Sequence, residues 1–337
     1  MIDLRASFVI PVLNEERYVA AAIESVLAQR GLAEREILVV LGQSTDRTDE
    51  VVTDLAQNHP EIRILHNPQN AISRSMNLGI RAAQFPVIVR VDAHASLPVD
   101  YAATAIRTLR EVGAVNVGGR MLAQGETPFE QAVAWGYNTP AGLGGAIYHT
   151  GGEAGPAESA YLGVFDREAV LAVDGFDESL SRGEDWDLNH RLIAHGGLVW
   201  FDPALEVSYR PRSTLTTLAR QFHASGRWRG EIIRRLRGRV PTRYFMPGAL
   251  VLTLAGGVGL ILNGTVGRGS RPRVVTGSIP WIVYGLWLGS SVGRADLSPA
   301  ARQQLLLVLP TMHMAWGSGA LLGIVKPSRG PNAFAGR

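Results

Sequence analysis

The sequence predicts an α/β fold, in which a domain with a mainly parallel β-sheet is followed by membrane helices. In the first 230 residues, short β-rich runs alternate with segments whose apolar residues recur at helical spacing, as in parallel strands joined by crossover helices. Beyond residue 243, three stretches without a charged residue each approach the length of a bilayer span. The chain has 337 residues and no cysteine, which excludes disulfides and thiolate chemistry.

The predicted elements of the first part follow one another regularly. Strands are expected at residues 7–12, 36–41, 62–65, 87–91 and 114–117, and helices around 19–27, around 51–55, at 72–83, at 101–112 and around 188–193. Asn14 is expected to cap the first helix, and Ser44 or Thr45 the second. The glycine-rich residues 118–155 predict either a mobile loop or an irregular linker. Ligands of open parallel sheets bind at the carboxyl ends of the strands, so the candidate site lies there.

Charge divides the chain into two unlike parts. Residues 1–230 contain 20 basic and 28 acidic residues, a net of −8, whereas residues 231–337 contain 13 basic and 2 acidic residues, a net of +11. A basic arm that binds nucleic acid is normally polar throughout, but here long apolar runs separate the arginines. The pattern therefore favours a membrane partner and no nucleic acid.

The uncharged stretches 244–264, 274–293 and 303–325 are predicted to be membrane helices. The positive-inside rule places the arginines that precede the first stretch in the cytoplasm. If all three stretches crossed the membrane, one basic loop would face outward, against this rule. One stretch could instead be a re-entrant segment, and all three could be buried helices of a soluble domain; both interpretations stay open. No signal peptide is expected before Ser7, which keeps the long N-terminal part on the cytoplasmic side.

The predicted organisation has four parts. They are a cytoplasmic domain at 1–230, a basic interfacial segment at 231–243, a membrane region with two to three hydrophobic helices at 244–326, and a disordered tail at 327–337. The single lysine against 32 arginines is typical of a GC-rich genome, which favours a bacterial protein and its inner (plasma) membrane.

Asp92 and His94 directly follow an apolar strand. On an extended backbone, two side chains separated by one residue point to the same side, so a carboxylate and an imidazole can share one divalent cation. Mn²⁺ accepts this pair of ligands more readily than Mg²⁺ does. An aspartate at the end of a strand is also a common turn residue, and this structural interpretation stays open.

Glu184, Asp185 and Asp187 form an acidic cluster at the expected start of a helix. Carboxylates in a first turn are stabilised by the helix dipole, which explains two of them. Adjacent like charges also raise one another's pKa, which suits a general base better than a cap. The cluster thus predicts a catalytic carboxylate.

Arg227 and Trp228 lie just before the basic segment. They are consistent with an interfacial amphipathic helix, and equally with a site that holds an anionic diphosphate close to the membrane. The two interpretations are compatible for an enzyme with a lipid-linked substrate.

A series of motifs in order resembles the family 2 glycosyltransferases, which have the GT-A fold. The matching residues are Phe8 to Glu16, Ser44 to Thr48, Arg74 to Gly79, Arg90 to Ala95, Gly175 to Glu178, and Glu184 with Asp185. The run Arg-Val-Asp-Ala-His-Ala at 90–95 is most similar to the branch of succinoglycan-type exopolysaccharide glycosyltransferases. The resemblance covers roughly residues 5–230 in succession, and the apolar tail resembles that branch too.

The resemblance implies an inverting transfer of a sugar from a nucleotide diphosphate sugar to an acceptor hydroxyl, with Mn²⁺ or Mg²⁺ as cofactor. It places Pro11, Asn14, Glu15 and Gln43 at the nucleotide, Arg74 and Asn77 near the ribose or diphosphate, Asp92 with His94 at the metal, and Asp185 beside Glu184 as the base. Asp92 would also contact the nucleotide sugar, and Arg227 and Trp228 would lie on the diphosphate or acceptor side. The expected acceptor is a lipid-linked saccharide.

One departure from the family bears on the donor. Members usually carry an acidic pair after the second strand, where this chain has Leu41, Gly42 and Gln43. Leu41 cannot accept the imide hydrogen of uracil, although Gln43 offers a donor and an acceptor. A UDP-sugar is therefore favoured and a GDP-sugar stays open. Two alternatives remain: transfer directly to polyprenyl phosphate, and a catalytically degenerate, membrane-anchored binding or scaffold subunit.

Overall fold

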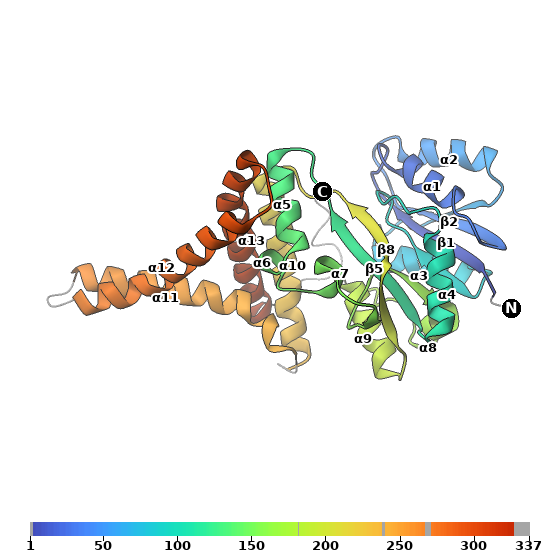
Figure 1. The fold of residues 1–337 in the computed structure, drawn as a ribbon. Coiled ribbons are helices and arrows are strands. Elements are labelled where there is room, and N and C mark those ends of the chain that lie inside the picture. The colour runs from blue at the N-terminus through green and yellow to red at the C-terminus, as the bar shows by residue number, and fades with distance from the viewer. Residues whose placement is uncertain (1–2, 181, 238–239, 267–270, 327–337) are drawn as a thin grey trace. The chain divides into compact units, whose positions relative to one another are not determined.

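The protein is described here by a computed structural model that covers residues 3–180, 182–237, 240–266 and 271–326 (Figure 1). The chain forms two compact units. The sheet unit comprises Met1–Leu122 and Ile147–Tyr209, and the helical unit comprises Ala123–Ala146 and Arg210–Arg329. Packing thus assigns two segments before residue 230 to the helical unit. The tail predicted at 327–337 lies outside the described residues.

The sheet unit is built on a sheet in the order β3-β2-β1-β4-β7-β5-β8-β6. The strands are β1 (Arg5–Val12), β2 (Glu34–Leu41), β3 (Ile62–His66), β4 (Val87–Arg90), β5 (Asn116–Ala123), β6 (Gly155–Pro156), β7 (Tyr161–Asp166) and β8 (Val199–Tyr209). The first four strands pair in parallel, and β7 is antiparallel to both β4 and β5. The predicted parallel sheet is confirmed, with antiparallel strands added at one side.

Helices cover both faces of this sheet. They are α1 (Val19–Leu27), α2 (Thr48–Asn58), α3 (Ile72–Ala82), α4 (Tyr101–Glu111), α7 (Ile147–Thr150), α8 (Arg167–Ala172) and α9 (Glu184–Ala194). Alternate residues of β1 enter different cores: Phe8 packs in the cluster that includes residues of α1 and α4, and Val9 in the cluster with α3 and α9. The period of two along a strand therefore builds both layers.

Both predicted helix caps were wrong. α1 begins at Val19 without a side-chain cap, and Asn14 has a positive φ of 56°. Its Oδ1 instead accepts a hydrogen bond from the Thr45 backbone N–H at 2.7 Å. Asp46, not Ser44 or Thr45, bonds the first turn of α2, because its carboxylate accepts from both the N–H and the hydroxyl of Thr48. These side chains tie the loop after β1 to the loop after β2.

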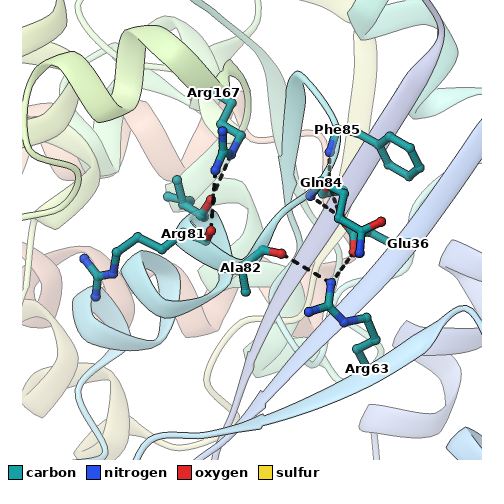
Figure 2. Close-up of polar contacts among 9 residues, drawn as sticks. Glu36, Arg63, Arg81, Ala82, Gln84, Phe85 and Arg167 are labelled. Carbon is teal, nitrogen blue, oxygen red and sulfur yellow. Dashed lines mark hydrogen bonds and ion pairs between the residues drawn. The ribbon is translucent and has the colours of Figure 1, made fainter.

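A buried carboxylate closes the opposite, amino end of the sheet (Figure 2). Glu36 accepts hydrogen bonds from the Ser7 hydroxyl at 2.6 Å, the Gln84 N–H at 2.6 Å and Arg63 Nη1 at 2.7 Å. Arg63 also donates to the carbonyl of Ala82, and Arg167 donates to that of Ile80 at 3.0 Å. Carbonyls at a helix C-terminus lack partners within the helix, so these arginines fix the end of α3 to the sheet.

The helical unit contains all three predicted apolar stretches. Its elements are α5 (Pro128–Asn138), α6 (Pro140–Leu143), α10 (Leu215–Arg235), a 3-10 turn (Thr242–Tyr244), α11 (Met246–Val266), α12 (Arg271–Arg294) and α13 (Pro299–Val325). By length and composition, α11 and α13 could cross a membrane. The loop or linker predicted at 118–155 was wrong, because the end of β5 and the helices α5, α6 and α7 form within it. Its apolar residues, such as Ala132 and Val133, are buried in helical packing.

Glycines bring α10 and α13 into close contact. A Cβ at Gly319 would lie 2.2 Å from the carbonyl oxygen of His223, and one at Gly323 would lie 2.0 Å from that of Arg227. On the other helix, a Cβ at Gly226 would lie 2.1 Å from the Trp316 carbonyl oxygen. Small residues at this spacing let two helix backbones approach each other closely.

We expect Gly319→Leu to separate these helices, because backbone atoms cannot move aside as a flexible side chain can. Overpacking of this kind costs about 1–3 kcal/mol or more, so the thermal unfolding midpoint of the purified protein should fall by several degrees. Gly259→Leu is the matched control, because no atom lies within 4 Å of a Cβ at that helical glycine. Equal midpoints for the two variants would contradict the close packing.

Candidate active site

Three carboxylates converge on one buried arginine at the carboxyl end of β4. Arg90 is the last residue of that strand, and its side chain is 8% exposed. Its Nε lies 3.2 Å from Asp92 Oδ1, and its Nη2 lies 3.6 Å from Glu184 Oε1. Nη1 donates a short hydrogen bond to Asp185. The predicted residues Asp92, Glu184 and Asp185 are thus brought together, by an arginine that carries no predicted role.

The balance of charge in this cluster sets the ionisation of Asp185. Burial raises the pKa of Asp185 to about 7; the Arg90 guanidinium opposes the rise, and the charges of Glu184 and Asp92 add to it. Burial lowers the pKa of Arg90, but the three carboxylates more than offset this and hold its pKa well above the ordinary value. A carboxylate whose pKa lies near neutrality can both hold and release a proton there, as a general base must.

The start of α9 presents the acidic residues. Gly183 precedes the helix with a φ of 73°, a left-handed conformation that glycine adopts without strain, and Glu184 and Asp185 form the first turn. Asp187 is instead paired with Arg191 one turn later, at 2.8 Å. The predicted cluster therefore divides into two carboxylates that face Arg90 and one that stabilises the helix.

The arrangement predicted for a metal site is only partly met. Residues 92–95 form a turn, closed by a hydrogen bond from the Ala95 N–H to the Asp92 carbonyl at 2.8 Å, so the backbone is not extended there as expected. Asp92 contacts Arg90, whereas His94 Nδ1 lies 3.2 Å from Glu15 Oε1. Within the described ranges, no group of three or more His, Asp or Glu side chains could hold a metal ion.

Four of the predicted nucleotide residues, Pro11, Asn14, Glu15 and Gln43, lie on β1 or on the loops after β1 and β2. Pro11 is on β1, opposite Val40 of β2, and Asn14 and Glu15 follow that strand. Gln43 is exposed, and its backbone N–H donates to Asn70 Oδ1 at 2.6 Å. Leu41, the last residue of β2, is buried in the core. Gln43 is therefore the polar side chain of this segment that faces solvent.

Asn77 lies in a different environment from the one predicted. It is 4% exposed on α3, and its side chain accepts from the Phe176 N–H at 2.8 Å and donates to the Phe176 carbonyl at 2.8 Å. A Cβ at Gly175 would lie 2.4 Å from Asn77 Oδ1. These contacts make Asn77 a brace for the loop before α9. Arg74, also on α3, pairs with Glu178 of that loop at 3.6 Å.

Replacing Asn77 should therefore destabilise the protein rather than abolish nucleotide binding directly. Asn77→Ala leaves the buried Phe176 N–H without its partner, which costs about 1–3 kcal/mol, and the unfolding midpoint should fall accordingly. Asn58→Ala, which removes an exposed side chain at the end of α2, is the control. A variant with an unchanged midpoint and a large loss of nucleotide affinity would show that Asn77 is a ligand instead.

Arg227 and Trp228 lie on α10, in the helical unit, and their predicted role at a diphosphate stays a prediction. Around them, Arg229 stacks on the Trp228 ring at 5.0 Å and on the Tyr244 ring at 4.0 Å from the ring centres. Such cation–π contacts hold an arginine and aromatic side chains together, as is common at membrane interfaces.

Two contributors to the site escaped prediction. Arg90 had a usable signal, because an arginine at the end of an otherwise apolar strand must find a buried partner for its charge. Asn70 had a weaker one: it has a positive φ of 58°, which asparagine tolerates, and it fixes the backbone of Gln43. A Cβ at Gly42 would lie 2.8 Å from its side chain.

The carboxylate cluster lies at the carboxyl end of a parallel sheet, which is where open α/β sheets bind their ligands. Residues 7–170 match the family model described as glycosyl transferase family 2. The chain is 30% identical to the succinoglycan biosynthesis protein ExoA of Rhizobium meliloti (strain 1021), over 92% of each chain. The chain belongs to glycosyl transferase family 2, in its succinoglycan-type branch.

Two further proteins are similar to this chain, one in sequence and one in fold. A dolichyl N-acetyl-α-D-glucosaminyl phosphate 3-β-D-2,3-diacetamido-2,3-dideoxy-β-D-glucuronosyltransferase of Methanococcus voltae is 27% identical, over 68% of this chain and 74% of that protein. The mannosyltransferase PcManGT from Pyrobaculum calidifontis, solved with GDP-Man and Mn²⁺, superposes with a TM-score of 0.57 at 16% identity, covering 95% of this chain and 86% of that chain. The predicted GT-A fold is confirmed.

Proposed function

We propose that the protein is an inverting glycosyltransferase that moves a sugar from a nucleotide diphosphate sugar to a lipid-linked saccharide, in the synthesis of a cell-surface polysaccharide or glycolipid. The observation that carries the proposal is the cluster at the carboxyl end of β4, in which Arg90 contacts Asp185 at the start of α9 together with Asp92 and Glu184. Asp185 takes the proton of the acceptor hydroxyl as that oxygen attacks the anomeric carbon. One base is enough for such a single displacement.

The nature of the acceptor is supported by two relatives. One is named for succinoglycan biosynthesis, and the other for a transfer to a dolichyl-linked sugar phosphate. An apolar helix of 21 residues, α11, would keep the enzyme at the membrane where such acceptors reside. We place the sheet unit on the cytoplasmic face of a bacterial inner membrane.

A divalent ion, Mn²⁺ or Mg²⁺, is part of the proposal. Asp92 and His94 offer the carboxylate and imidazole ligands that Mn²⁺ accepts, and such ions commonly bind one or two protein ligands together with substrate phosphates. The ion would neutralise charge on the departing diphosphate. Arg90 already orients the Asp92 carboxylate, and Glu15 contacts the His94 ring.

Calorimetric titration of the detergent-solubilised protein with UDP, GDP, CDP and dTDP tests the donor site. We expect one nucleotide, with UDP favoured and GDP the alternative, to bind with Mn²⁺ and to lose affinity with excess chelator. Asp92→Ala should remove most of the metal dependence. Binding that is unchanged and still chelator-sensitive in that variant would contradict the metal assignment, and no binding of any nucleotide by folded protein would favour a degenerate scaffold subunit.

A further inference from the structure

We propose that α11 and α12 form the membrane-crossing hairpin of this protein, and that α13 lies outside the hydrocarbon core, on the same side as the sheet unit. The inference rests on the membrane association proposed above. It separates the two helices, α11 and α13, that length and composition alone mark as possible spans.

The middle of α13 packs against α5 and α6. A Cβ at Gly136 of α5 would lie 2.8 Å from Met312 Sδ, and His313 Nε2 donates to the Ala141 carbonyl of α6 at 2.8 Å. The first turn of α5 contains the buried Glu130, whose carboxylate lies 3.9 Å from Arg210. If this part of α13 lay in the hydrocarbon core, the ion pair of Glu130 and Arg210 would have to lie in or near lipid as well.

The order of the elements along the chain also argues that α5 and α6 do not cross the membrane. The chain inserts α5 and α6 between β5 and β7, so both ends of this segment return to the sheet unit. At 1.5 Å per residue, the 11 residues of α5 extend only ~17 Å, too short to cross a hydrocarbon core of ~30 Å. A helix that packs along α5 is therefore on the side of the sheet unit, at least over that contact.

The second half of α13 packs against α10, which is highly charged. Gly319 and Gly323 meet the backbone of His223 and Arg227. The helix α10 carries Arg220, Arg227, Arg229, Glu231, Arg234 and Arg235. If α13 crossed the bilayer, the middle of α10 would lie near mid-depth, where arginine side chains are strongly unfavourable. The middle and the second half of α13 thus have partners that argue against a transmembrane position.

The hairpin of α11 and α12 differs from α13, because its apolar side chains are largely exposed. Its helices meet at Gly257 and Gly277, and Trp281 Nε1 donates to the Leu254 carbonyl at 3.1 Å. Both helices expose large apolar side chains, among them Leu252, Leu262, Ile279, Ile282 and Leu286. Of the apolar stretch of α11, 17% is buried within the protein, against 39% for that of α13. Figure 1 shows the hairpin projecting from the other helices of its unit.

Length and charge identify a lipid bilayer as the occupant around this hairpin. The 21 residues of α11 extend ~31 Å, close to the ~30 Å of a hydrocarbon core. Arginines flank it at both ends: Arg243 and Arg294 at the base, and Arg271 and Arg273 near the turn. Long basic side chains reach anionic headgroups from positions near a helix end. A soluble partner would not require an uncharged surface bounded by arginines at this spacing.

Single cysteines test this topology cleanly, because the natural chain has none. The variants are Thr265→Cys near the hairpin turn, Gln303→Cys and Val325→Cys at the two ends of α13, and Glu168→Cys as the marker of the sheet unit. All four side chains are exposed. Each full-length variant is labelled with a membrane-impermeant maleimide in right-side-out and in inverted membrane vesicles, and again after detergent solubilisation.

We expect the thiols at 168, 303 and 325 to be labelled in the same vesicle orientation, and the thiol at 265 only in the opposite one. Labelling at 303 and 325 in opposite orientations, or labelling of either only after solubilisation, would show that α13 is embedded. Labelling at 265 on the side of residue 168, or only after solubilisation, would show that the hairpin does not cross. Protein absent from the membrane fraction would overturn this inference, whereas nucleotide binding by that protein would preserve the transferase proposal.

Discussion

Asp185→Asn is expected to lose sugar transfer by about 10²-fold or more, the scale of removing a general base, while nucleotide binding is retained. The amide has nearly the same shape as the carboxylate and can still contact Arg90, but it cannot take the proton of the acceptor hydroxyl. Turnover is measured with saturating donor, and donor affinity by calorimetry. Asp187→Asn is the matched control on the same helix, because Asp187 pairs with Arg191 instead.

The pH dependence provides a second readout of the same assignment. Asp185 must be deprotonated to act, and its pKa lies near 7 in this structure. The value of kcat/KM should therefore fall as the pH drops below about 7, up to tenfold for each pH unit. Asp187→Asn should keep this profile. Wild-type turnover in Asp185→Asn would exclude Asp185 as the base.

Arg90→Met is expected to be the most destabilising single change in the sheet unit. It leaves Asp92, Glu184 and Asp185 facing one another without a cation, and removing one partner of a buried ion pair costs about 3–5 kcal/mol. The thermal midpoint should therefore drop sharply near neutral pH. Arg110→Met is the control, because its more exposed pair with Asp166 should contribute about 0–1 kcal/mol.

The pH response distinguishes lost charge balance from lost packing. Without the Arg90 guanidinium, which lowers the pKa of Asp185, that pKa rises further above about 7, so Asp185 becomes protonated at a higher pH and no longer repels Asp92 and Glu184. The difference in stability between wild type and Arg90→Met should therefore be largest well above pH 7 and shrink as the pH falls to about 7, below which Asp185 is protonated in both proteins. Arg90→Lys should recover part of the stability, since it keeps the charge but not the planar fork of donors. A stability difference that stays constant with pH would contradict the electrostatic role.

The sequence predicted the fold well because the fold follows from periodicity. The run from Phe8 to Val12 and the helical spacing around Ile23 and Ile106 determine which face of each element is buried, and the structure confirms them. Caps were harder: the positive φ of Asn14 and the side-chain bond from Thr45 depend on a loop 31 residues away. Periodicity carries no information about such contacts.

The sequence indicated the carboxylates of the candidate site, but it did not indicate that Arg90 brings them together. Asp92 and Asp185 stand out because acids follow an apolar strand and open a helix, but Arg90 becomes meaningful only when α9 lies against β4. Asn77 differs: the family resemblance places it near the nucleotide, whereas in the structure its amide bonds Phe176, 99 residues away, a contact that the sequence does not indicate. Likewise, hydropathy marks α13 as a possible span, and our proposal that it does not cross rests on its packing against α5 and α10, which the sequence does not reveal.

The most direct test of the central claim is sugar transfer into lipid. Membranes containing the full-length protein are incubated with Mn²⁺ and labelled nucleotide sugar of the class that binds by calorimetry, and the labelled lipid is extracted and separated. We predict a labelled lipid-linked saccharide with wild type and with Asp187→Asn, and none with Asp185→Asn. Equal incorporation with Asp185→Asn, or no incorporation by wild-type protein that binds its nucleotide, would contradict an active transferase that uses this site.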